Sequence, residues 1–348
     1  MPVLRINGYT VPVAQGSLGI KPIEIGDRVK SYNGITLSQR SNHKRSISFT
    51  TTPLSEMEAE ALKGLVRGVG EYWSFDGDAN GNVSASEFPA YLYSSKGVRP
   101  LAVSGNVAQQ TSSVKFGGGS LTPGKPLNYP LSVVTGLQDL TINVWASDVA
   151  TPNPGAATHI FLTEDGSNNN KISLTRGASA NSLIFTTKSN GGTLHTLTYA
   201  TTPWDGAGNF HMVTAVIRRN PEGAEKLKYL YFDGTLVASA TSGASATSAP
   251  TLANVTRVHI GDDSTSGSEW DKYLDDFMVV PYAATPDIIS AWYGMGKAMS
   301  TLPKIYVDGD VIQDDLLTTE FIGHIGSSKY IYAGGETKQT LSITLEET

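Results

Sequence analysis

Hydrophobic and polar residues alternate along most of this chain, and the alternation predicts β-strands. The first fifty residues contain short alternating segments between Gly and Asn turns, such as Ile23–Ile25 and Arg45–Phe49. Similar segments recur from Tyr72 to Tyr282, for example Leu140–Trp145 and His211–Ile217, and they return after residue 303. Regular spacing of short strands is typical of a two-sheet sandwich. We therefore expect a mainly β protein.

One early segment has helical spacing instead. Its apolar side chains recur three or four positions apart, which predicts a helix over Thr52–Gly68. Pro53 suits the first turn, while Ser55 and Glu58 offer an alternative capping box one turn later. We expect the helix to end at Gly68 or Gly70, because glycine accepts the left-handed backbone that ends helices.

The last strands follow a second predicted helix, which begins at Thr285-Pro286. A final segment of fewer than about 50 residues is too short to bury its own core. Residues 1–70 and 300–348 are therefore predicted to form one discontinuous β domain with one helix, interrupted by a sandwich over 71–299. Residues 1–75 carry nine Lys and Arg against six Asp and Glu, and residues 300–348 carry three against eight. Opposite charge would suit packing of the two ends, although solvated charges give the same counts.

Composition excludes several classes of function. The 348 residues include no Cys, which excludes disulfide scaffolds and Cys nucleophiles. A net charge of −6 disfavours a broad electrostatic surface for nucleic acid. No apolar run reaches the roughly 18 residues of a membrane span, so we expect no membrane insertion. The N-terminal residues lack the features of a signal peptide, and we expect synthesis and folding in a cytoplasm.

One twelve-residue segment, Asp76–Glu87, matches the calcium-loop pattern D-x-[DN]-x-[DN]-G-x5-E at every defined position. Ca²⁺ takes six to eight oxygen ligands, which such a loop supplies from alternate positions around a glycine turn. The candidate ligands are Asp76, Asp78, Asn80, Asn82, Ser84 and Glu87. Ca²⁺ is accordingly the expected cofactor if the loop is a metal site.

The segments on either side of this loop favour a second interpretation. Trp73–Phe75 has a strand pattern, and Pro89 prevents a regular helix after Glu87. An EF-hand has helices at both places. A polar turn between two strands would also be rich in Asp, Asn and Gly. Both interpretations stay open.

The middle of the chain, about residues 75–290, resembles the laminin-G-like, concanavalin-A-like jelly roll. Several short stretches occur in the order that this family shows: Trp73–Gly77, Val114–Leu121, Leu140–Trp145, Phe210–Thr214, Leu230–Gly234, His259–Asp263, Leu274–Phe277 and a closing helix with Ile289, Trp292 and Tyr293. The resemblance implies a jelly-roll fold. It also implies a calcium near the start of the domain with Asp275 as a further ligand, and Asp275 capping a strand or turn is the alternative. Function does not follow from this fold alone.

The flanking segments resemble tail proteins of tailed bacteriophages, of the distal tail or baseplate type. The residues that carry this are the Arg45–Phe49 strand, the Thr52–Gly68 helix, Tyr72–Phe75 and the terminal Leu341–Leu345 strand. Such proteins often carry inserted carbohydrate-binding modules. The resemblance implies a location in the virion tail, after assembly in the cytoplasm of the bacterial host.

Sugar binding requires exposed aromatic rings and polar side chains that reach hydroxyls. Trp204-Asp205 and the Asn168–Asn170 loop are candidates, although a Trp in a jelly roll is more often a core residue. The six His are scattered without metal spacing, and His211 and His259 are expected to be structural.

Enzymatic activity is not expected. Related β-glucan hydrolases carry paired carboxylates in a pattern like E-x-D-x-x-E, and this pattern is absent. Motifs for serine hydrolases, zinc proteases and nucleotide binding are absent as well.

The sequence therefore predicts a structural virion protein of the tail or baseplate. Its jelly roll would face outward for adhesion to host-surface carbohydrate or for decoration. Other tail proteins are the expected partners, and a homo-oligomeric ring is the expected assembly. The alternative is a carbohydrate-active enzyme or a free lectin of the concanavalin-A-like class.

Overall fold

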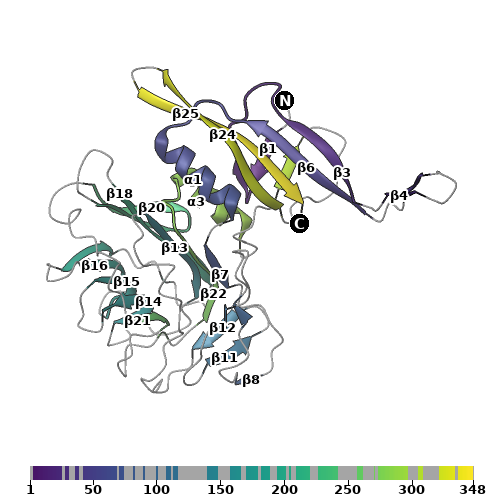
Figure 1. Cartoon of the computed structure of the whole chain (residues 1–348). Coiled ribbons are helices and arrows are strands. Elements are labelled where there is room, and N and C mark those ends of the chain that lie inside the picture. Colours follow the sequence, from purple (N-terminus) through teal and green to yellow (C-terminus); the bar gives the residue numbers. More distant parts are fainter. Residues whose placement is uncertain are drawn as a thin grey trace. The chain divides into compact units, whose positions relative to one another are not determined.

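The structure is a computed structural model of the chain (Figure 1). It describes residues 3–25, 28–30, 36–38, 42–68, 70–73, 81–82, 89–90, 99–100, 107–110, 113–116, 139–147, 157–165, 170–178, 182–188, 194–200, 204, 209–219, 226–241, 257–261, 270, 273–296, 305–308, 321–333 and 336–347. Within these residues strands predominate, which confirms the predicted mainly β class with sandwich-type sheets. None of the helices in this part of the chain is long and apolar enough to cross a membrane.

The chain divides into two compact units. The terminal unit consists of residues Met1–Val69 and Leu302–Thr348, and the central unit consists of Gly70–Thr301. The terminal unit is thus discontinuous in sequence, and its two segments must fold together to bury a common core.

The main sheet of the terminal unit has four antiparallel strands in the order β24-β25-β6-β3 (Figure 1). Their bounds are β3 Gly19–Ile25, β6 Asn42–Thr50, β24 Phe321–Ala333 and β25 Glu336–Glu347. The late strand β25 lies beside the early strand β6, with Ile343 opposite Phe49 and Leu345 opposite Ile47. All four of these side chains are buried. Alternation at both ends of the chain therefore produces one shared hydrophobic face.

Two smaller sheets complete the described strands of the terminal unit. The first has the order β2-β1-β23, and the second pairs β4 with β5. The bounds are β1 Val3–Ile6, β2 Tyr9–Thr10, β4 Arg28–Lys30, β5 Thr36–Ser38 and β23 Ile305–Asp308. Early and late residues meet again here, because Ile6 lies opposite Ile305 and Leu4 opposite Val307.

Helix α1, Glu56–Arg67, begins later than Pro53, so the interpretation with Pro53 in the first turn is wrong. The Ser55 hydroxyl accepts a hydrogen bond from the Glu58 N–H at 3.3 Å, and the Glu58 carboxylate accepts one from the Ser55 N–H at 2.8 Å. This capping box satisfies two backbone donors at once, which fixes the start of the helix. The helix ends at Gly68, as predicted, where φ is 58°. Its buried face consists of Ala59, Ala61, Leu62, Leu65 and Val66.

The central unit contains a nine-stranded and a five-stranded antiparallel sheet. The larger follows the order β20-β19-β18-β13-β22-β12-β11-β8, and β7 also pairs with β22. Its bounds are β7 Glu71–Trp73, β8 Gly81–Asn82, β11 Val107–Gln110, β12 Ser113–Phe116, β13 Leu140–Ser147, β18 Phe210–Arg219, β19 Lys226–Phe232, β20 Thr235–Ala240 and β22 Tyr273–Val280. The smaller follows the order β17-β16-β15-β14-β21. Its bounds are β14 Thr158–Glu164, β15 Lys171–Arg176, β16 Leu183–Lys188, β17 Leu194–Tyr199 and β21 Arg257–Ile260. A short pair joins β9, Pro89–Ala90, to β10, Arg99–Pro100.

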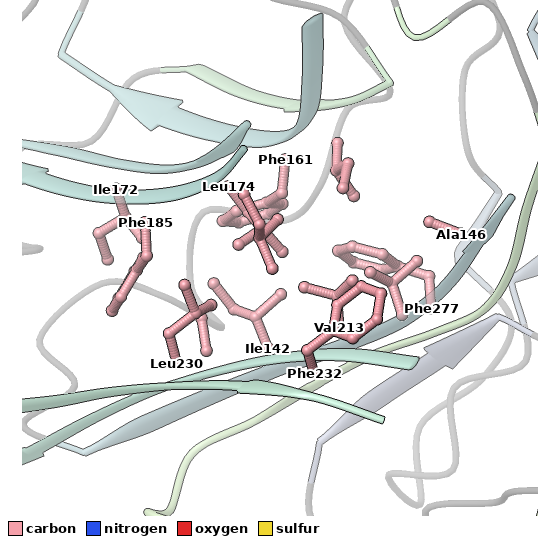
Figure 2. Packing of buried hydrophobic residues seen from close by; sticks show 14 of the residues in the cluster. Ile142, Ala146, Phe161, Ile172, Leu174, Phe185, Val213, Leu230, Phe232 and Phe277 are labelled. Carbon is pink, nitrogen blue, oxygen red and sulfur yellow. The ribbon is translucent and has the colours of Figure 1, made fainter. Parts of the chain in front are cut away.

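These two sheets pack face to face around one hydrophobic core (Figure 2). Figure 2 shows Leu174 and Phe161 on the five-stranded sheet pointing toward Ile142, Leu230 and Phe277 on the nine-stranded sheet. The rings of Phe161 and Phe277 lie 5.7 Å apart. Burial of each large apolar side chain contributes about 1.5–3 kcal/mol, so this cluster is the main source of stability in the central unit.

Helix α3, Pro286–Met295, begins where the sequence predicted, with Thr285 as N-cap and a proline in the first turn. The approach to it is fixed by a buried hydroxyl. Thr141 Oγ1 on β13 donates to the Tyr282 carbonyl at 2.7 Å and accepts from the Ala284 N–H at 2.9 Å. Two backbone groups that strand pairing leaves open are thereby satisfied.

Candidate functional site

The predicted calcium loop lies almost wholly outside the described residues. This applies to the candidate ligands Asp76, Asp78, Asn80, Ser84 and Glu87. Only the backbone of Gly81-Asn82 is described, and it forms strand β8, where Asn82 pairs with Ala108 of β11. Loop positions six and seven therefore lie at an edge of the nine-stranded sheet. The calcium site stays a prediction.

Asp275, the further ligand that the family resemblance implies, lies at a bulge in β22. The pairing with β13 shifts between Asn143 and Trp145, so that Asp276 and Phe277 stand opposite one residue. Asp276 has φ 42° there, a backbone conformation that Asp adopts more readily than most residues. Asp275 Oδ1 accepts a hydrogen bond from the Asp276 N–H at 2.9 Å, and both side chains are buried. This contact fits the alternative role, in which Asp275 caps the backbone of the bulge.

The described residues do not contain a cluster of three or more His, Asp or Glu side chains that would hold a metal ion. Asp275 and Asp276 therefore need ligands from elsewhere in the chain to form such a site.

His211 has a structural role, as predicted. Its Nδ1 lies 2.8 Å from Asp233 Oδ2, and Asp233 Oδ1 accepts a hydrogen bond from the Met212 N–H at 2.9 Å. Asp233 and Gly234 form the tight turn between β19 and β20, with φ 49° and 74°. The carboxylate thus connects this turn to the start of β18. The Phe232-Asp233-Gly234 motif in the sequence is the signal of this arrangement.

Trp204 is a core residue and does not present its ring for sugar stacking. The side chain is only 3% exposed. Its ring packs edge-on against the rings of Trp270, Phe232 and His211, with centroids 5.5, 5.7 and 6.1 Å away. The hypothesis of an exposed stacking Trp204 is therefore wrong, and its alternative as a core residue is confirmed. Its neighbour Asp205 lies outside the described residues.

Asn170 is the described residue of the Asn168–Asn170 loop, and it is fully buried. Its Nδ2 donates to Asp165 Oδ2 at 3.3 Å, and its φ is 48°. Asn170 therefore shapes the connection between β14 and β15 and does not reach outward. The other two asparagines lie outside the described residues.

Lys228 is a buried ionisable side chain in the central unit. It lies on β19 between Leu227 and Tyr229 and is 2% exposed. Burial lowers the pKa of its ammonium group from 10.5 to about 8. The neighbouring Tyr231 is also buried, and this burial together with the Tyr229 hydroxyl raises the pKa of Tyr231 to about 12. Both shifts favour neutral groups within this sheet.

Known families agree with this geometry. Residues 122–290 match the sequence model of the concanavalin A-like lectin/glucanases superfamily. These residues are a concanavalin A-like domain. No curated protein matches the chain.

Solved structures similar to this chain include carbohydrate-binding proteins. The botulinum neurotoxin DC binding domain in complex with SialylT is 16% identical, with a TM-score of 0.42 over 63% of this chain and 52% of that one. The Ruminococcus gnavus IT-sialidase CBM40 bound to α2,3 sialyllactose is 17% identical, with a TM-score of 0.38, and the match covers 51% of this chain and 95% of that one. The botulinum neurotoxin serotype G binding domain is 10% identical, with a TM-score of 0.44, and the match covers 75% of this chain and 68% of that one. The match thus spans about half the length of the first of these proteins.

Proposed function

We propose that this protein binds glycans through its concanavalin A-like domain. The observation that carries the proposal is the match of residues 122–290 to a superfamily of lectins and glucanases, which the two-sheet sandwich supports. Sandwich domains present loops and sheet faces on a rigid scaffold, and such surfaces are suited to recognition.

Binding without hydrolysis is favoured over enzymatic activity. Glycoside hydrolysis requires two carboxyl groups about 5–10 Å apart that both contact the sugar. In the described part of the domain, Asp275 and Asp276 are adjacent carboxyl groups, but they are 1% and 0% exposed. A sugar cannot contact them in this conformation. A glucanase-like activity is the alternative, and release of reducing ends from β-glucan would support it.

A glycan array tests this proposal. The full chain should bind a defined subset of immobilised oligosaccharides, and an unrelated β protein with the same tag should not. Free oligosaccharide should compete for the same spots. If the folded chain binds no glycan on a broad array, the proposed function is wrong.

The terminal unit is proposed to attach the glycan-binding domain to the tail or baseplate of a tailed bacteriophage. The β24–β25 hairpin supports a role in assembly, because it carries two exposed aromatic residues. The side chains of Tyr330 and Tyr332 are 64% and 79% exposed. They lie two residues apart on β24, so both point to the same side of the hairpin. Tyrosine is enriched at protein interfaces. A second copy of the chain in a ring is the proposed partner.

The oligomeric state tests this second part. Electron microscopy of the purified chain should show rings, and Tyr330→Ser with Tyr332→Ser should shift the chain to monomers. Leu194→Ser, which replaces another exposed apolar residue, is the control and should leave the rings intact. A monomeric wild-type chain at high concentration would contradict the ring, and it would favour the free lectin.

A further inference from the structure

Tyr293 is exposed on a helix whose two isoleucines and tryptophan are buried. It is 42% exposed, whereas Ile289 and Trp292 of α3 are 0% and 1% exposed. Helix α3 therefore anchors itself with these two residues and leaves the tyrosine at the surface. An aromatic ring held in this way does not fill the core.

The ring of Tyr293 is held flat by Trp145 of β13. The ring centroids are 5.9 Å apart and the planes differ by 15°. Trp145 points away from the sandwich core, because its neighbours Val144 and Ala146 belong to that core (Ala146 is labelled in Figure 2). The indole thus supports one face of the tyrosine and fixes its orientation.

Gly234 leaves room for the Tyr293 ring because it has no side chain. A Cβ atom at Gly234 would lie 3.1 Å from Tyr293 Cβ and 3.3 Å from its Cγ, and the glycine has φ 74°. A residue with a side chain would strain the turn and press against the ring, so glycine suits this position best. The Asp233-Gly234 turn, which the His211 contact holds in place, therefore also positions Tyr293.

Strand β20, which contacts α3, carries a second exposed apolar side chain. Leu236 lies two residues after Gly234 on this strand and is 48% exposed, so it adds apolar surface to this part of the central unit.

We propose that Tyr293, supported by Trp145, is the stacking surface for a neutral hexopyranose. Sugar rings have an apolar C–H face that packs on aromatic rings, while their hydroxyls point to the side. The Asp233 carboxylate next to Gly234 is held in place by the Met212 N–H, so it disfavours an acidic sugar such as a sialic acid. This inference rests on the proposed function and locates it on one residue.

Three substitutions of Tyr293 test the stacking surface. Tyr293→Ser should weaken binding of neutral oligosaccharides about tenfold, because it removes the ring. Tyr293→Phe keeps the ring, and its affinity should stay within about twofold of wild type. Tyr293→Leu keeps an apolar cover over Trp145 without an aromatic face, so it should lose binding while it keeps the wild-type melting temperature. Leu194→Ser, which removes another exposed apolar side chain of the central unit and lies outside the proposed ring contact, is the control and should bind normally.

The outcomes separate this inference from the proposed function. If wild type binds neutral glycans and both Tyr293→Ser and Tyr293→Leu bind equally well, the function stands and this site is wrong. If the chain binds sialylated glycans alone, the neutral class is wrong. If wild type binds no glycan, both the function and the site are wrong.

Discussion

Arg45 and Glu347, which lie near opposite ends of the sequence, form a bidentate ion pair between β6 and β25. Arg45 Nε donates to Glu347 Oε2 at 3.0 Å, its Nη2 donates to Oε1 at 3.3 Å, and its backbone N–H donates to Oε2 at 2.9 Å. The hydrogen bonds from Arg45 lower the pKa of Glu347 below its ordinary value. The pair connects the two segments of the terminal unit.

Glu347→Gln should destabilise the terminal unit by about 1 kcal/mol near neutral pH, because both side chains keep some solvent exposure. The folded-state pKa of Glu347 is lowered, so its contribution is present above the unfolded value and is lost as the pH falls through the folded value. The difference between wild type and variant in urea unfolding should therefore disappear in strong acid. Glu346→Gln, one residue away and exposed, is the control and should have little effect. A difference that is equal at neutral and acid pH would contradict this account.

Gly323→Ala should disrupt the packing of α1 on β24. A Cβ atom at Gly323 would collide with the backbone carbonyl of Val66 on α1, whereas one at Gly326 of the same strand would meet Ser342 O at an ordinary 3.7 Å. Because a backbone atom cannot move aside cheaply, we expect a loss of about 3 kcal/mol or more for Gly323→Ala. Gly326→Ala should change stability by less than about 1 kcal/mol. Equal melting temperatures for the two variants would show that α1 does not pack on β24 in this way.

Stability of the central unit should rise between about pH 8 and pH 10 because of Lys228. Its folded-state pKa is about 8, against 10.5 in the unfolded chain. Over this range the unfolded chain binds more protons than the folded one, so unfolding becomes less favourable as the pH rises. The raised pKa of Tyr231, about 12, acts in the opposite direction, but only above the ordinary tyrosine value of 10.0.

Lys228→Met should remove this rise and stabilise the protein near neutral pH by at most about 3 kcal/mol. Lys188→Met, at a partly exposed position on β16, should retain the rise. Thermal melting across this pH range measures both. A wild-type melting temperature that falls steadily from pH 8 would contradict a lowered pKa of the buried Lys228.

Calcium should stabilise the wild-type chain if Asp76–Glu87 is a metal loop. Two Asp and one Glu repel one another unless a cation neutralises them, and binding to the folded form adds about 2.7 kcal/mol at a hundredfold excess over Kd. A chelator should therefore lower the melting temperature, and Asp76→Ala with Glu87→Ala should abolish that effect. Ser86→Ala, at a loop position that supplies no ligand, is the control. If neither calcium nor a chelator changes the melting temperature, the loop is a polar turn and not a metal site.

Local patterns in the sequence were sufficient for the elements and the fold class. Alternation predicted the strands β13 and β18, and the Thr285-Pro286 pair predicted the start of α3. Strands and helix caps depend on residues that are close in sequence. The ordered stretches from Leu140 to Phe277 also indicated the concanavalin A-like domain. At the start of α1 the sequence left two alternatives, and hydrogen-bond geometry at Ser55 chose between them.

The role of each candidate side chain was decided by tertiary structure. No local signal distinguishes the buried Trp204 from the exposed Tyr293, because burial depends on which strands and helices pack against each residue. The stack of Tyr293 on Trp145 joins residues from distant parts of the chain, as does the ion pair of Arg45 with Glu347. The sequence by itself thus determined a mainly β chain with two helices and a concanavalin A-like middle. Which aromatic ring faces solvent, and which charges meet, followed only from the pairing of distant segments, since these contacts are set by strand order and not by neighbours in sequence.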